Sequence, residues 1–228
     1  MTGPVVILFG PPASGKSTLS EQLVAKRNAR LFRLREYVQS LPEAETAVLK
    51  GTSRDSLGWL PDDIATQLVH DAISGPFQPG ETPVVFEGYP GNGVQSRHLA
   101  DLLTRLDVSA TVIHLRADWA TALQRAQLRR VCLHCEPTAT GQPHKPAQVT
   151  TADTCARCGN TLLQRQDDNP DRLSSRTQRF TSRLPEIYTA LTGHGIPWRT
   201  VDSHPPACEV LAVALDAVSN CPSTRSSQ

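Results

Sequence analysis

A glycine-rich stretch near the start of the chain constrains the fold more than any other feature. It follows the apolar run 5–9, precedes a helical pattern over 16–27, and reads Gly10-Pro11-Pro12-Ala13-Ser14-Gly15-Lys16-Ser17-Thr18. The spacing satisfies G-x-x-x-x-G-K-[ST], in which glycines let backbone N–H groups curl around an anion. In this pattern Lys16 reaches the β and γ phosphates, Ser17 takes a magnesium ligand position, and the following helix points its N-terminus at the same phosphates. The stretch therefore predicts a strand, a phosphate-binding loop and a helix; the alternative is a chance turn.

Length and composition fit one α/β core with an insertion. The 228 residues are 39% hydrophobic and 20% charged. The longest wholly apolar runs have five or six residues, and the N-terminus shows no charged region followed by a long apolar one. We therefore expect no signal peptide and a cytoplasmic protein that does not enter a membrane. A net charge of +1 argues against a protein that binds nucleic acid non-specifically along its length. The 19 Arg against 4 Lys suit phosphate binding, but a genome-wide bias gives the same ratio, so position decides for each arginine.

Short apolar runs alternate with helical patterns along the chain. The runs typical of buried parallel strands are 4–9, 29–32, 83–86, 110–115 and 197–201. The helical patterns are 16–27, 35–40, 43–50, 62–73, 95–105, 118–129, 173–191 and 206–218. This alternation predicts an α/β fold, with a parallel sheet covered on both faces and the nucleotide at the carboxyl ends of the strands. Residues 219–228 are mostly small or polar and are expected to form a flexible tail.

An acidic residue closes the strand expected at 83–86. Glu87 stands directly after this run and before Gly88-Tyr89-Pro90. The carboxyl end of such a strand lies beside the phosphate loop, where an acid approaches magnesium and its waters. We expect Glu87 to have this role; the alternative is an ordinary surface glutamate at a strand end.

The cysteines are clustered. Two C-x2-C pairs, separated by 19 residues, are formed by Cys132 with Cys135 and by Cys155 with Cys158. Cys208 and Cys221 stand alone. In a cytosolic chain this spacing indicates a metal site and not a disulfide framework. Four thiolates complete a tetrahedral zinc site and leave no position for water, so we predict structural zinc, with four unligated thiols as the alternative. His134 and His144 lie in the segment and could replace a ligand, although solvated loop histidines are the favoured interpretation.

Arginines bracket the cysteine segment, and they are Arg125, Arg129, Arg130, Arg165 and Arg176. From 129 to 165 five positive and two negative side chains give a net charge of +3. A positive lid suits a phosphate site, because phosphoryl transfer requires charge neutralisation and exclusion of water. Asp167 and Asp168 follow directly and either latch this lid by holding its arginines or form a solvated turn.

Together these motifs resemble the adenylate kinase family, in its long form with a zinc-bearing lid. The motifs that carry the likeness are the loop 10–18, Glu87-Gly88-Tyr89-Pro90 with Gln95, Leu128-Arg129-Arg130-Val131-Cys132, Leu163-Gln164-Arg165-Gln166-Asp167-Asp168-Asn169-Pro170, and Arg176. The likeness covers nearly the whole chain. It implies a P-loop NTPase fold with a five-stranded parallel sheet. The implied parts are a core (1–33, 83–128 and 165–218), an acceptor-binding insertion (34–82), a zinc lid (129–164) and the tail (219–228).

The resemblance implies transfer of the γ-phosphoryl group of ATP to a nucleoside monophosphate, AMP or a relative, with Mg²⁺ and structural Zn²⁺. The implied catalytic residues are Lys16, Arg129, Arg165, Arg176 and Glu87, with Arg125 and Arg129 also binding ATP alongside Gly10, Ala13, Ser14, Gly15, Lys16, Ser17 and Thr18. No general base is needed, because the acceptor is already a phosphate anion. We expect a monomer whose partners are small molecules.

The acceptor half departs from the family pattern. Leu34 and Gln39 stand where the family has a Thr and an Arg that hold AMP, and Gly91 replaces a second AMP arginine. Each missing guanidinium removes charge-assisted hydrogen bonds worth about 1.5–3 kcal/mol. Arg33 and Arg35 are near enough in sequence to substitute for one of them. The acceptor-side candidates are Arg35, Leu34, Gln39, Trp59, Leu60, Gly88, Tyr89, Gly91, Gln95, Arg165 and Arg176.

Three functions remain open at this point. The first is a kinase that accepts AMP or a related monophosphate. The second keeps the fold and the donor chemistry but phosphorylates a different nucleotide or small molecule. The third is a zinc-ribbon module that recognises nucleic acid or protein and uses ATP as a switch, although no aromatic side chain for base stacking lies between Arg129 and Asp168.

Overall fold

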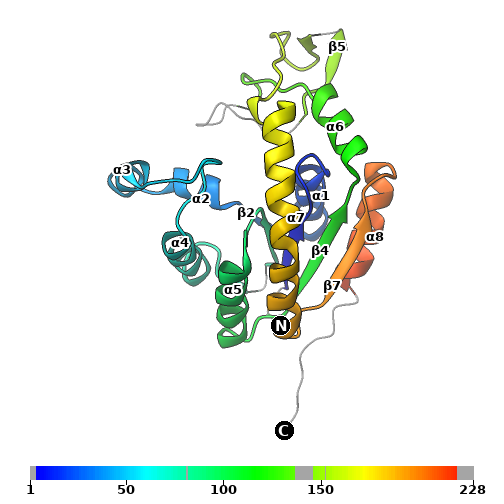
Figure 1. Ribbon diagram of the computed structural model, residues 1–228. Coiled ribbons are helices and arrows are strands. Elements are labelled where there is room, and N and C mark those ends of the chain that lie inside the picture. Colours follow the sequence, from blue (N-terminus) through cyan, green and yellow to red (C-terminus); the bar gives the residue numbers. More distant parts are fainter. Residues whose placement is uncertain (1–3, 81, 137–145, 152, 220–228) are drawn as a thin grey trace.

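A five-stranded parallel sheet forms the centre of the protein (Figure 1). The computed structural model describes residues 4–80, 82–136, 146–151 and 153–219. In sheet order the strands are β2 Arg30–Phe32, β3 Val84–Glu87, β1 Val5–Phe9, β4 Ala110–Arg116 and β7 Trp198–Asp202. All residues of β1 are buried, as a strand between two helical layers requires. The predicted α/β fold is therefore confirmed.

Helices cover both faces of the sheet. Successive side chains of a strand point to opposite sides, so the apolar strands present an apolar surface on each face. The described α-helices are α1 Lys16–Arg27, α2 Leu34–Ser40, α3 Glu43–Gly51, α4 Asp62–Ser74, α5 Gly93–Arg105, α6 Trp119–Leu128, α7 Pro170–Gly193 and α8 Ala207–Ser219. Val5 and Ile7 of β1 share a core with side chains of α4, α5 and α7. Val6 and Leu8 point the other way and share a core with α1 and α8. The sheet is thus the middle of three layers.

The register of the sheet brings the ends of three strands together. Leu8 of β1 lies opposite Glu87 of β3, and Phe9 lies opposite His114 of β4. The glycine-rich loop that follows Phe9 therefore starts beside Glu87, at the carboxyl edge of the sheet. This edge is where ligands bind in open α/β sheets.

Two segments extend from the core. Helices α2, α3 and α4 project to one side of the sheet in Figure 1. The cysteine segment lies beyond one end of α7 and contains β5 Val149–Thr151, paired antiparallel with β6 Thr154–Cys155. A bridge between Val131 and Leu163 closes the base of this segment. The short 3-10 helix Gln166–Asp168 then leads into α7.

The observed bounds follow the predicted ones closely, and the largest shift is at the start of α7. The pattern predicted a helix from 173, but α7 begins at Pro170. The Asn169 side chain accepts a hydrogen bond from the Asp171 N–H, and a proline fits the first helical turn, so the helix starts earlier. At the other end of the chain, Ser219 belongs to α8 and not to the predicted tail, while 220–228 lie outside the described residues. Among the described residues, no helix has the length and apolarity needed to cross a bilayer.

Candidate functional site

The glycine-rich loop folds into a cradle of backbone N–H groups. Gly10, Ala13 and Gly15 have φ angles of 157°, 60° and 92°, and α1 begins directly afterwards at Lys16. A Cβ at Gly10 would lie 2.6 Å from Ser14 Oγ and 2.9 Å from the Leu115 carbonyl, so this close approach requires glycine. Left-handed residues within a tight turn make the concave amide surface that binds anions.

The side chains of Lys16 and Ser14 are suited to an anion at this loop. Lys16 Nζ donates to the carbonyls of Gly10 and Pro11, each at 2.7 Å. Burial lowers the pKa of Lys16 to about 7, and nearby arginines add to this effect while Glu87 opposes it. Ser14 Oγ is buried and has no hydrogen-bond partner among the described residues. An orphaned donor and a destabilised ammonium fit a phosphate ligand at this loop.

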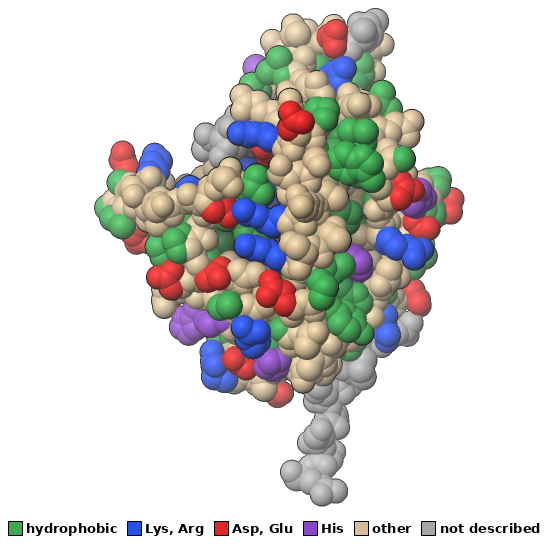
Figure 2. Space-filling model, viewed as in Figure 1, with side chains coloured by type: hydrophobic (Ala, Val, Ile, Leu, Met, Phe, Trp, Pro, Cys, Tyr) green, Lys and Arg blue, Asp and Glu red, His purple; other side chains and the backbone are tan. Residues whose placement is uncertain are grey.

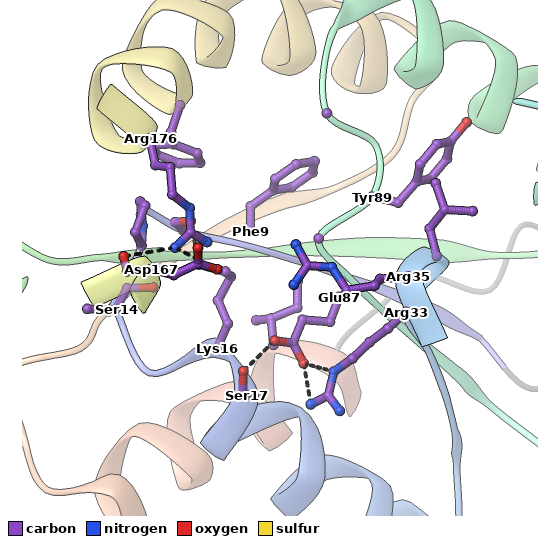
Figure 3. A pocket seen from close by; sticks show the side chains of 18 of the residues that line it. Phe9, Ser14, Lys16, Ser17, Arg33, Arg35, Glu87, Tyr89, Asp167 and Arg176 are labelled. Carbon is purple, nitrogen blue, oxygen red and sulfur yellow. Dashed lines mark hydrogen bonds and ion pairs between the residues drawn. The ribbon is translucent and has the colours of Figure 1, made fainter. Parts of the chain in front are cut away.

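Glu87 is the centre of a polar network below the loop (Figure 3). Ser17 Oγ donates to Glu87 Oε1 and Ser20 Oγ donates to Glu87 Oε2, both at 2.6 Å. Arg33 contacts Glu87 Oε2 through Nε at 2.8 Å and Nη2 at 2.7 Å. Burial raises the pKa of Glu87, but the charge of Arg33 and these hydrogen bonds outweigh it and hold the pKa below its usual range. A carboxylate one hydrogen bond from Ser17 fits the magnesium position predicted for this pair, and that role stays a prediction.

The arginines that flank the cysteine segment lie close enough to Lys16 of the loop to lower its pKa. Arg129 makes a bidentate ion pair with the fully buried Asp168, at 2.7 and 2.5 Å. Asp167 Oδ2 lies 3.6 Å from Arg165 Nη2 and 3.8 Å from Arg176 Nη1. Burial and the neighbouring Arg129 lower the pKa of Arg165 to about 10, and its Nε has no partner among the described residues. The site therefore holds more positive charge than its own carboxylates neutralise.

Arg125 is the remaining arginine that was predicted to bind ATP, and it contacts Ser203. Arg125 of α6 donates to the backbone carbonyl of Ser203 at 2.5 Å and to its hydroxyl at 3.2 Å. Both residues line the same cavity as the loop. The contact of Arg125 with the ATP ring stays a prediction.

The four clustered cysteines have the geometry of a metal site. Cys132 Sγ lies 3.5 Å from Cys158 Sγ, Cys135 Sγ lies 3.8 Å from Cys155 Sγ, and all four sulfur atoms fall within 4.8 Å of one another. Tetrahedral zinc with Zn–S bonds of about 2.3 Å separates its sulfurs by about 3.8 Å, so the set fits zinc. His134 is exposed and outside this group, whereas the predicted alternative ligand His144 lies outside the described residues.

The acceptor half is continuous with the loop in one cavity of about 1400 Å³. Of the predicted acceptor residues, it is lined by Leu34, Arg35, Gln39, Trp59, Leu60, Gly88, Tyr89, Gly91, Gln95, Arg165 and Arg176. Gln95 is already engaged: its Oε1 accepts from the Gly91 N–H and its Nε2 donates to Asp62 Oδ1, both at 2.7 Å. Leu34 and Leu60 pack partly against the core. The predicted acceptor residues therefore line one cavity, although the amide of Gln95 already makes hydrogen bonds within the protein.

Sequence reasoning missed several polar residues of this cavity and its supporting network. Arg179 and Arg183 line the cavity from α7, Ser20 binds Glu87, and Asp62 holds Gln95. The arginine spacing 172, 176, 179 and 183 follows one helical face, and this signal could have identified Arg179 and Arg183. Arg33 was one of two arginines near enough in sequence to substitute for a missing acceptor contact, but its guanidinium forms an ion pair with Glu87.

The fold, the loop and the cation cluster define a P-loop nucleotide-binding protein. A family model described as an AAA domain matches residues 5–132. The adenylate kinase of Erythrobacter litoralis is 30% identical over 217 residues, which are 93% of this chain and 98% of the relative. That of Bacillus cytotoxicus is 30% identical over 82% of this chain and 87% of the relative, and that of Symbiobacterium thermophilum is 27% identical over 93% and 97%. The chain belongs to the adenylate kinase family.

Proposed function

We propose that the protein transfers the γ-phosphoryl group of ATP to a nucleoside monophosphate, AMP or a relative. The single observation that carries this proposal is the cation cluster around the loop, in which Lys16, Arg129, Arg165 and Arg176 face one cavity with too few carboxylates to neutralise them. Family membership and the orphaned Ser14 Oγ add support. The charge and the cavity suit two phosphorylated ligands that meet beside the loop.

Catalysis would rest on position and charge. The cradle and Lys16 hold the β and γ phosphates, and the arginines spread over the transferred group as charge develops on its oxygens. The bond between the γ phosphorus and the β–γ bridging oxygen breaks, and a bond to an acceptor phosphate oxygen forms. The acceptor oxygen carries no proton at neutral pH, so no side chain has to act as a base.

Two metals would assist. Ser17 and Glu87 are the residues that would hold magnesium, directly or through water, and the ion would supply positive charge that offsets the charge of the phosphates. Zinc, held by the four cysteines, would stabilise the lid over 129–164, whose described residues form only a small core. Arg129 and Arg165 stand at the two ends of this lid, so its closure would bring their charges onto the transferred group and exclude water.

The test is phosphate transfer from ATP-Mg to a panel of AMP, CMP, GMP and UMP, with zinc analysis of the same sample. Lys16→Ala should lower kcat/KM by about 100- to 1000-fold, as expected for loss of a positioned charge. Lys26→Ala is the matched control, because Lys26 is an exposed lysine of the same helix. Activity of the Lys16 variant near the wild-type level would remove the role assigned to the loop.

A second candidate function keeps the donor chemistry and uses a different nucleotide or small-molecule acceptor. It is favoured by Gln95, whose amide is held by Gly91 and Asp62, and by the apolar Leu34 in the acceptor cavity. Slow conversion of AMP with rapid conversion of another acceptor would select this alternative. The third reading, a recognition module without phosphotransfer, has no support from the family comparison.

A further inference from the structure

We propose that Arg183 and Arg179 of α7, held against the ring of Trp59, bind the phosphate of the acceptor in this chain. They would replace the guanidiniums that the family pattern places at positions 39 and 91. This inference rests on the proposed function and assigns its acceptor-phosphate site to two arginines of α7 that the sequence motifs did not single out, beyond Arg176 on the same helix.

The spacing on α7 directs its arginines to one side. Arg172, Arg176, Arg179 and Arg183 follow each other by four, three and four residues, which places them on one helical face. All four line the cavity, and Figure 2 shows Lys and Arg side chains gathered along the edge of α7 that faces the projecting helices. At a rise of about 1.5 Å per residue, Arg183 lies about 10 Å along the helix from Arg176. One helix face thus carries positive charge from the donor site into the acceptor half.

Trp59 holds these two arginines in place. The Arg179 guanidinium carbon lies 5.2 Å from the centre of the Trp59 ring, and that of Arg183 lies 5.5 Å from it. Both distances are within the range of a cation–π contact. A guanidinium stacked on a ring keeps its edge N–H groups available, and its fork matches two phosphate oxygens. The Trp59 ring therefore positions the two guanidinium groups without accepting hydrogen bonds from their edge N–H groups.

The Trp59 ring packs directly against Gly91. A Cβ at Gly91 would lie 2.0 Å from Cζ3 and 2.7 Å from Cη2 of Trp59, so the ring occupies the space that any side chain at 91 needs. The present position of the Trp59 ring and an arginine at 91 therefore exclude each other. The positive charge beside the turn after β3 comes instead from the two arginines of α7 that lie over this ring.

The two arginines differ in how far they are neutralised. Arg179 Nη1 lies 2.5 Å from Asp55 Oδ2. Arg183 Nη1 donates only to the Gly91 carbonyl, at the long distance of 3.4 Å, and no ion pair of Arg183 with a carboxylate is found among the described residues. Arg183 is therefore the stronger candidate for an anion contact, and Arg179 supports it from the next turn.

The experiment compares Arg183→Ala and Arg179→Ala with wild type and with the control Arg97→Ala, an exposed arginine of α5. With ATP-Mg and the monophosphate that wild type uses best among AMP, CMP, GMP and UMP, Arg183→Ala should raise the acceptor KM about 10-fold or more. The KM for ATP should stay within about twofold, and Arg179→Ala should have the smaller effect. Arg183→Lys keeps the charge without the fork and should recover part of the loss.

A second measurement separates this inference from the proposed function. Calorimetric titration of each monophosphate without ATP should show binding to wild type that weakens in Arg183→Ala. Unchanged acceptor KM and binding in that variant, with active wild type, would overturn the inference alone. If no monophosphate binds to wild type or is phosphorylated by it, both the inference and the proposed function are wrong.

Discussion

Binding of ATP should make the protein take up a proton at Lys16. In the free protein, burial lowers the pKa of this lysine from 10.5 to about 7. At pH 8 a group with that pKa is about 90% neutral, and at pH 6 it is about 90% charged. Phosphates beside Nζ favour the ammonium and return its pKa toward the ordinary value of 10.5. Uptake should therefore be about 0.9 proton per ATP at pH 8 and about 0.1 at pH 6.

The assay is calorimetric titration of ATP-Mg in two buffers with different ionisation enthalpies, at each pH. The dependence of the observed enthalpy on the buffer gives the number of protons taken up. Lys16→Met should abolish the uptake at pH 8, while Lys26→Ala should keep it, which separates the lysine from protons carried by ATP itself. Equal uptake in wild type and Lys16→Met, or no change between the two pH values, would refute the reasoning.

Three further changes test the site and the lid. Cys155→Ser should lower the zinc content and reduce Tm by about 4 °C or more; an unchanged zinc content and Tm would rule out a four-thiolate site. Arg33→Met leaves the buried Glu87 carboxylate without its cation and should lower the free energy of unfolding by about 3–5 kcal/mol in urea titrations, and a loss below about 1 kcal/mol would contradict the network described. Gly91→Ala should cost about 1–3 kcal/mol of unfolding free energy through the clash with Trp59. Adding Trp59→Ala should relieve that clash, whereas strictly additive losses in the double variant would argue against it.

The sequence predicted the parts of the molecule whose chemistry is local. The phosphate loop needs glycine at the positive φ angles of Gly10 and Gly15, so its pattern is readable within nine residues. The cysteine pairs likewise carry their spacing in the chain, and the four sulfur atoms meet as expected. The alternation of strands and helices predicted the sheet because buried parallel strands require continuous apolar runs.

The acceptor half was less predictable because its contacts join distant segments. The Trp59 ring and Gly91 meet only after α4 has returned the chain to the sheet. Arg33 was considered for the acceptor because of its place in the sequence, but the fold directs it to Glu87 of the neighbouring strand. Arg179 and Arg183 belong to no short motif, and their helical spacing gains meaning only beside a cavity.

The packing of Trp59 against Gly91 also restricts how this sequence can evolve. Restoring an arginine at 91 by a single substitution would meet the indole ring, and replacing Trp59 alone would remove the surface that orients Arg179 and Arg183. If Arg179 and Arg183 bind the acceptor as proposed, each single substitution would therefore be harmful by itself, although the two together open the space. A change in this form of acceptor recognition would then require both positions to change together.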